Sequence, residues 1–230
     1  MSNLVGLGLY TPAEAGRLLH IAPSKISRWL KGHQAHGTRY APLWKPQVNL
    51  RDGHAYLGFR DLMEVRIANT FISYGISAQR IRAAIVLASE IMGQERPLST
   101  DRFRTDGREI FFRILDKDED GEERERLLNL FRKQYEFKQI IEPLLRTVDF
   151  DSDGEPTHWW PAGRKANVVI DPSRAFGQPI DASSSVPTAV LAAAGKAHGV
   201  PQTAKDYFVS QKAVKSAISF EDHLGTRAAA

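Results

Sequence analysis

The first thirty residues alternate apolar and polar positions with the spacing of two short amphipathic helices. Apolar residues return every three or four positions in residues 11–20 and again in residues 21–30, which places them on one face of each helix. These residues are Ala15, Leu18 and Leu19 in the first helix, and Ile26, Trp29 and Leu30 in the second. Two short helices joined by a tight turn predict a helix-turn-helix.

The residues that begin each helix agree with this prediction. Thr11 is an expected N-cap, Pro12 occupies the favoured first helical position, and Glu14 completes a capping box. Pro23 opens the second helix in the same way.

The segment after the second helix, residues 33–52, is rich in Gly, Pro and basic residues. It ends in a turn at Asp52 and Gly53, after which residues 55–59 predict a short strand. A basic loop that ends in a strand is typical of the wing of a winged helix. The aromatic residues of the segment are equally suited to covering the edge of the core. The basic residues are Arg39, Lys45 and Arg51.

Two longer amphipathic helices are predicted next, over residues 60–74 and 76–92. Gly75 is expected to end the first and Ser77 to cap the second. Their apolar faces contain Leu62, Val65, Ile67, Phe71 and Ile72, and then Ile81, Ala84, Ile85, Ala88 and Ile91.

The pattern changes in the middle of the chain. Residues 101–105 and 108–115 flank an Asp-Gly pair at 106–107, which predicts a β-hairpin. Residues 116–125 are the most charged stretch and predict a solvated loop or the start of a helix. Residues 127–131 are a further candidate strand.

A helix and a second hairpin complete this middle unit. Residues 135–145 have a helical pattern, with a proline in the last turn. Residues 148–150 and 157–160 flank the turn 151–154 and predict the hairpin. The apolar face of the helix consists of Phe137, Ile140, Ile141 and Leu144.

The last third predicts three helices, over residues 188–198, 202–208 and 211–224. The short second helix and the third again have helix-turn-helix spacing. DNA binding and protein contact are both open as roles for this unit. Its exposed cations are expected to include Lys205, Lys212 and Lys215.

The sequence as a whole predicts a mainly α protein with small β elements, an α+β fold. We expect a winged helix-turn-helix over residues 1–98 and a mixed α/β unit with hairpins over 99–163. A three-helix, helix-turn-helix-like bundle over 164–224 and a flexible tail over 225–230 are expected to follow.

Composition limits the class of protein. The chain has 230 residues, 42% of them hydrophobic, which is enough for more than one core. Its 31 Lys and Arg against 27 Asp and Glu give a net charge of +4, so any charged surface must come from local clustering. Without cysteine there is no disulfide or thiolate metal site. Neither a signal peptide nor a membrane-spanning run is evident, which favours a cytoplasmic protein.

The second predicted helix carries the candidate chemistry. Its outward positions hold short hydroxyls and long cations, which suit contacts to phosphates and base edges of DNA. An ordinary helical hairpin with a solvated basic face has the same pattern. For base and phosphate contact we select Ser24, Lys25, Ser27 and Arg28, and for backbone contact Lys31 and Arg39.

No motif indicates an enzyme, a metal site or a cofactor. The acidic loop at 149–155 lacks the bidentate glutamate that an EF-hand requires, so we interpret it as a plain hairpin turn. The seven histidines are scattered, without metal-ligand spacing. A phosphate-binding loop and a nucleophile elbow are both missing. The acidic residues of the loop are Asp149, Asp151, Asp153 and Glu155.

Residues 56–82 resemble the helices that follow the wing in MerR-type regulators, a resemblance that spans about residues 8–92. It departs from the family in the long insert at 34–52 and in lacking a dimerising coiled coil. The MerR modes of dimerisation and effector sensing are therefore not carried over.

The carboxyl-terminal third also resembles a known family. The run Ile-Asp-Pro…Phe-Gly-Gln-Pro within residues 169–179, then Val-Pro-Thr at 186–188 and a small helical bundle, looks like a domain of bacterial antitoxins. With the MerR-like half, the whole chain resembles the large VapB-type antitoxins of toxin–antitoxin operons. At 182–185 it has Ala-Ser-Ser-Ser where relatives carry a glycine-containing turn.

The resemblance implies a partner and a mechanism. The partner is a PIN-domain ribonuclease toxin, which the antitoxin neutralises, and the complex represses its own operon by binding double-stranded operator DNA. A homodimer or a hetero-oligomer with the toxin would match a palindromic operator. In the tail, Arg227 is a candidate toxin contact, against the alternative of a frayed terminus.

A second functional class stays open. A stand-alone MerR-like transcriptional regulator would bind a small-molecule or protein effector in the middle unit. Trp159 and Trp160, next to Pro161, are candidates for lining such a pocket, although aromatic residues more often form core.

Overall fold

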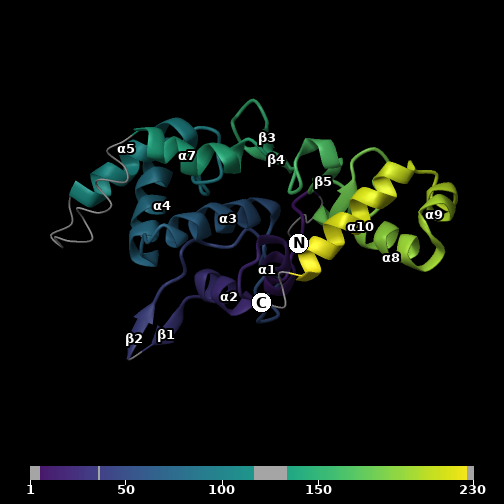
Figure 1. Cartoon of the computed structure of the whole chain (residues 1–230). Helices are drawn as coiled ribbons and strands as arrows, with labels where there is room; N and C mark the ends of the chain where they lie inside the picture. Colours follow the sequence, from purple (N-terminus) through teal and green to yellow (C-terminus); the bar gives the residue numbers. More distant parts are fainter. Residues whose placement is uncertain (1–5, 36, 117–133, 227–230) are drawn as a thin grey trace.

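The computed structural model describes residues 6–35, 37–116 and 134–226. Figure 1 shows an elongated arrangement in which α3, α4 and α5 lie toward one end and α8, α9 and α10 form the other. The first two helices and strand β5 lie between these ends. The described residues are mainly helical with two small antiparallel sheets, which confirms the α+β prediction.

The amino-terminal helices form where the sequence predicts them. Helix α1 (Pro12–Leu19) has a complete capping box: Glu14 N donates to Thr11 Oγ1 at 3.2 Å, and Thr11 N donates to Glu14 Oε2 at 2.7 Å. Helix α2 (Pro23–Lys31) packs on α1 and buries its predicted apolar face, namely Ile26, Trp29 and Leu30.

The hairpin beside α2 lies earlier in the chain than predicted. Strands β1 (His33–Ala35) and β2 (Thr38–Tyr40) pair directly after α2. The strand predicted at 55–59 is wrong: Leu57 makes only an isolated bridge with Tyr10. Leu57 and Phe59 are buried in the core, and the chain turns at once into α3.

Helices α3 (Phe59–Ser73) and α4 (Ala78–Met92) match the two predicted long helices. Ser77 caps α4, because its hydroxyl accepts from Arg80 N at 3.3 Å. Most of the predicted apolar positions are buried, whereas Ile91 is exposed.

The first predicted hairpin of the middle unit is wrong, because residues 103–116 form helix α5 (Phe103–Asp116). The Asp-Gly pair predicts a turn, yet Phe103, Gly107 and Ile110 are buried at helical spacing. Phe103 stacks edge-on against Phe71, with ring centroids 6.1 Å apart. The segment therefore forms a helix because this conformation buries one apolar face, although its Asp-Gly pair locally favours a turn.

The second hairpin and its helix are confirmed. Helix α7 (Gln134–Leu145) contains Pro143, and strands β3 (Val148–Phe150) and β4 (Pro156–Trp159) follow it. Residues 117–125 and 127–131, for which we predict a charged loop and a strand, lie outside the described residues.

Two further strands extend this hairpin into a four-stranded antiparallel sheet in the order β3-β4-β5-β6. They are β5 (Val168–Ile170) and β6 (Pro179–Asp181). Short 3-10 turns cover Arg164–Ala166 and Ala175–Gly177. Strands on both sides of residue 163, where the sequence predicts a domain boundary, thus share one sheet.

The chain ends in the predicted three-helix unit. It consists of α8 (Thr188–His198), α9 (Val200–Asp206) and α10 (Gln211–Thr226). Helix α10 packs mainly on α8 and also contacts α1. No helix among the described residues is long and apolar enough to cross a membrane.

One large buried cluster joins most of the molecule. It runs from Tyr10 through the four amino-terminal helices to Trp159 and Ile170 of the sheet. A smaller cluster around Phe220 of α10 lies beside it, and Leu18 of α1 packs against both. The helix pair α1–α2 is therefore anchored in the main core.

Candidate nucleic-acid interface

The turn between α1 and α2 is tight and requires a glycine in the preceding helix. His20 has a left-handed backbone with φ 55°, and Ile21 N donates to Gly16 O at 3.0 Å. A Cβ on Gly16 would lie 2.5 Å from Ile21 O and 3.2 Å from Pro23 Cγ. The two helices can therefore approach this closely only because residue 16 has no side chain.

The outer face of α2 is polar, cationic and mostly open to solvent. Ser24, Arg28 and Lys31 are exposed, and Ser27 is half-buried. Together with Lys25, this short helix thus carries two hydroxyls and three cations, without an acidic residue in its nine positions. The arrangement suits an anionic surface.

Lys25 folds back onto the protein, as does Lys31, whose Nζ donates to Gly53 O. The Nζ of Lys25 donates to Asn69 Oδ1 of α3 at 2.9 Å and lies 5.0 Å from the centroid of the Trp29 ring. Burial, and next the charge of Arg28, lower the pKa of Lys25 below its usual value. The Lys25 ammonium group is therefore already engaged within the protein and is less available to a ligand than an exposed cation.

The hairpin β1-β2 projects beside α2, as Figure 1 shows. Gly32 has φ +72°, and a Cβ there would meet the backbone oxygen of Tyr40, so only glycine allows this entry into the hairpin. The rings of His33 and Tyr40 stack at 4.8 Å, and Arg39 is exposed. Of the predicted site residues, this hairpin thus carries Arg39.

The segment after the hairpin is held by a carboxylate that the sequence reasoning missed. Asp61, fully buried in the first turn of α3, accepts from Trp44 Nε1 at 3.1 Å and Gln47 N at 2.7 Å. It also accepts from Gly58 N at 3.0 Å and pairs with Arg96 Nε at 2.6 Å. An acidic residue at the third position of a helix is the only sequence signal of this role.

The carboxyl-terminal unit exposes a second set of polar groups. Lys205, Lys212 and Lys215 are exposed, as predicted. Phe208, in the turn between α9 and α10, is 96% exposed with φ 54°. The structure therefore leaves both DNA and protein as possible partners of this unit.

The acidic loop at 151–155 is a self-closed turn. The side chain of Asp151 accepts from Asp153 N and Glu155 N, both at 2.9 Å. Within the described ranges no group of three or more His, Asp or Glu residues is placed to hold a metal ion. Arg227, the candidate toxin contact, lies outside the described residues.

The fold defines an α+β protein in which two short helices, joined by a tight turn, pack against each other near the amino terminus. No protein-family model matches the chain. A Mycobacterium tuberculosis protein named "Putative antitoxin VapB45" is 30% identical over 221 residues, covering 91% of this chain and 92% of that protein. The crystal structure of Rv2018 from the same organism aligns with a TM-score of 0.74 at 27% identity, covering 94% of this chain and all of that one. The chain belongs to the VapB-type antitoxins.

Proposed function

We propose that this chain neutralises a PIN-domain ribonuclease toxin and binds operator DNA to repress the operon that encodes both. Membership of the VapB-type antitoxins supports the first role. The exposed cations and hydroxyls of α2 support the second. In this role the chain needs no catalytic residue, metal or cofactor of its own, and it acts in the cytoplasm, where operon and transcript are present.

The observation that carries DNA binding is the face of α2. Ser24 and Arg28 are exposed near the start and middle of the helix, and Arg39 of the adjacent hairpin is exposed as well. A helix of this kind lies in the major groove while flanking cations contact phosphates. Dimerisation, alone or through the toxin, would place two copies on a palindrome with half-sites about one helical turn apart.

Replacement of Arg28 by Ala tests this interface. Each lost phosphate contact lowers the slope of log affinity against log salt concentration by about one unit. We expect R28A and R39A each to weaken binding to duplexes from the region upstream of the gene. Fluorescence anisotropy over a series of KCl concentrations measures both affinity and slope.

Arg146→Ala, an exposed cation at the end of α7, is the matched control and should change neither quantity. K25A should have a smaller effect than R28A, because Lys25 already contacts Asn69. Unchanged affinity and slope in both R28A and R39A would exclude α2 and the hairpin from the interface.

Toxin binding is tested by co-expression with the neighbouring reading frame. We expect a ribonuclease to co-purify with the chain and to be inactive in the complex. A chain truncated after Thr226 loses the tail that contains Arg227, so it should inhibit the ribonuclease less while binding DNA normally. Full inhibition by the truncated chain would show that the tail is not a toxin contact.

The same experiment separates the antitoxin from a stand-alone regulator. If DNA binding is present but no co-expressed neighbour associates with the chain or is inhibited by it, the regulator is the correct function. A neighbour that is toxic alone and harmless with this chain supports the antitoxin.

A further inference from the structure

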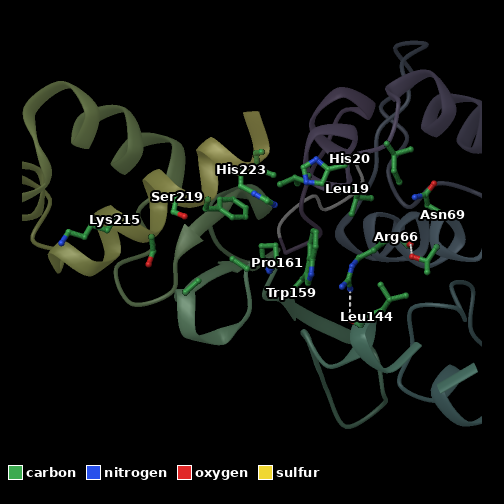
Figure 2. Close-up of a pocket in the computed structure, with 18 residues that line it drawn as sticks. Leu19, His20, Arg66, Asn69, Leu144, Trp159, Pro161, Lys215, Ser219 and His223 are labelled. Carbon is green, nitrogen blue, oxygen red and sulfur yellow. Dashed lines mark hydrogen bonds between the residues drawn. The ribbon is translucent and has the colours of Figure 1, made fainter. Parts of the chain in front are cut away.

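A cleft of about 710 Å³ separates the helix-turn-helix from the carboxyl-terminal helices. One wall contains Leu19, His20 and Ile21, at the end of α1 and in the turn before α2. The opposite wall is α10, and Trp159 of β4 lies between the two walls (Figure 2). This volume is typical of small-molecule sites, which often lie between structural units.

The lining combines apolar surface with positive charge. Leu19, Trp159 and Phe220 supply the apolar part, whereas Arg66 and Lys215 carry cations. Among the described residues that line the cleft, none carries a carboxylate. The nearby carboxylates of α10 are already engaged elsewhere: Glu221 pairs with Arg17, and Asp222 pairs with Lys196.

Arg66 is the most informative residue of the cleft. Its guanidinium donates to Leu144 O at 2.9 Å and Thr147 Oγ1 at 3.0 Å, and it lies 4.8 Å from the centroid of the Trp159 ring. Both hydrogen-bond acceptors are neutral. Burial lowers the pKa of Arg66 to about 10. Arg66 is half-buried, and a charge withdrawn from water is normally paired with an opposite charge, which the described residues do not supply here.

We propose that this cleft binds a small amphipathic organic anion. Its carboxylate or phosphate group lies against Arg66, and its apolar part packs on Trp159, Leu19 and Phe220. The anion supplies the counter-charge that Arg66 lacks, and its apolar part fills the space between α1 and α10.

Occupancy of the cleft has a consequence for DNA binding, which depends on the proposed function. The ligand touches His20 and Ile21, the turn that sets the position of α2. It also touches α10, so it fixes the helix-turn-helix relative to the carboxyl-terminal unit. We therefore expect the anion to change operator affinity.

Calorimetric titration of the full-length chain with four probes tests the site. The probes are naphthylacetate, naphthyl phosphate, naphthylethanol and inorganic phosphate. We expect one or both naphthyl anions to bind about tenfold more tightly than neutral naphthylethanol, as a charge-assisted hydrogen bond contributes. Inorganic phosphate, which lacks the apolar part, should bind more weakly than the better naphthyl anion. A comparison of the two anions identifies the preferred head group.

Variants place the ligand in the cleft. Arg66→Met should weaken naphthyl anion binding about tenfold, because it removes the cation that faces the anion. Lys212→Met, an exposed lysine of α10 that does not line the cleft, should have no effect. If Arg66→Met does not fold, Ser219→Trp decides the question, since it fills the cleft from an exposed position of α10 and should abolish naphthyl anion binding with the core intact.

Equal binding of naphthylacetate, naphthyl phosphate and naphthylethanol, or unchanged anion binding in Arg66→Met and Ser219→Trp, overturns the proposal. A loss of DNA affinity in Lys215→Met without any naphthyl anion binding overturns it as well, and assigns the cleft to DNA phosphates. The titrations contain no DNA and no toxin, so their result does not depend on whether the proposed function is correct.

Discussion

Two buried carboxylates, one helical turn apart on α3, hold the segments that pack beside α2 and α3. Asp61 pairs with Arg96 and accepts hydrogen bonds from the 44–58 segment. Glu64 accepts from Leu98 N at 3.1 Å and from Ser99 N at 2.9 Å, both neutral donors. Burial therefore outweighs these bonds and raises the pKa of Glu64 from 4.5 to about 7.

This shift predicts a pH dependence of stability. Because the folded state holds the Glu64 proton more tightly than the unfolded chain, its contribution is fully present below pH 4.5 and is lost as the pH rises to about 7. Glu64→Gln cannot ionise. Relative to this variant, the free energy of unfolding of the wild type should fall by up to about 1.4 kcal/mol per pH unit over that window.

Urea unfolding of wild type and Glu64→Gln at a series of pH values measures the difference. Glu90→Gln, at an exposed position of α4, is the control and should follow the wild type. Parallel curves for wild type and Glu64→Gln would show that Glu64 ionises normally in the folded chain.

At the scale of elements, local signals and helical periodicity agree in some segments and conflict in others. In α1, the Thr11 cap, Pro12 and the apolar face all indicate the same helix, and it forms with those bounds. In α5, the Asp-Gly pair favours a hairpin while Phe103 and Ile110 have helical spacing. Because a Cβ on Gly107 would lie 2.8 Å from the Phe103 ring, this glycine serves packing within the helix and not a turn.

The hairpin beside α2 shows a different limit of sequence reasoning. Residues 55–59 have the apolar, aromatic composition of a strand, yet Leu57 and Phe59 are buried against the helices and only Leu57 forms a bridge. The strands form instead at residues 33–40, which are polar. The apolar residues at 55–59 are therefore explained by burial in the core and not by strand pairing.

At the scale of the whole molecule, contacts far apart in sequence attach the amino-terminal segment to the sheet. Tyr10 Oη donates to Gly177 O at 2.7 Å, and Leu9 N donates to Phe176 O at 3.0 Å. A Cβ on Gly177, which has φ +80°, would collide with Tyr10. Burial raises the pKa of the Tyr10 phenol, so the hydroxyl stays protonated and remains a donor.

Tyr10→Phe tests the strength of this attachment. It removes the donor and leaves the buried Gly177 carbonyl without this partner, which should lower the free energy of unfolding by about 1–3 kcal/mol. Chemical denaturation measures the loss. Tyr207→Phe, at an exposed position, is the control and should be close to neutral. An unchanged stability for Tyr10→Phe would mean that this long-range bond does not contribute to folding.

The sequence by itself determined the elements whose signals are local. These include the capped helix α1, the apolar faces of α2, α3 and α4, the hairpin β3-β4 and the helical carboxyl-terminal unit, because caps, turns and periodicity act within a few residues. It also selected an exposed cationic face on α2, since outward positions follow from the same periodicity.

Only the tertiary structure decided which distant residues meet. The Lys25–Asn69 contact, the Asp61–Arg96 pair and the Arg66 cleft each join residues at least 35 positions apart or walls from different elements. No spacing rule encodes such contacts, because burial and charge pairing depend on how the packed elements are placed in space.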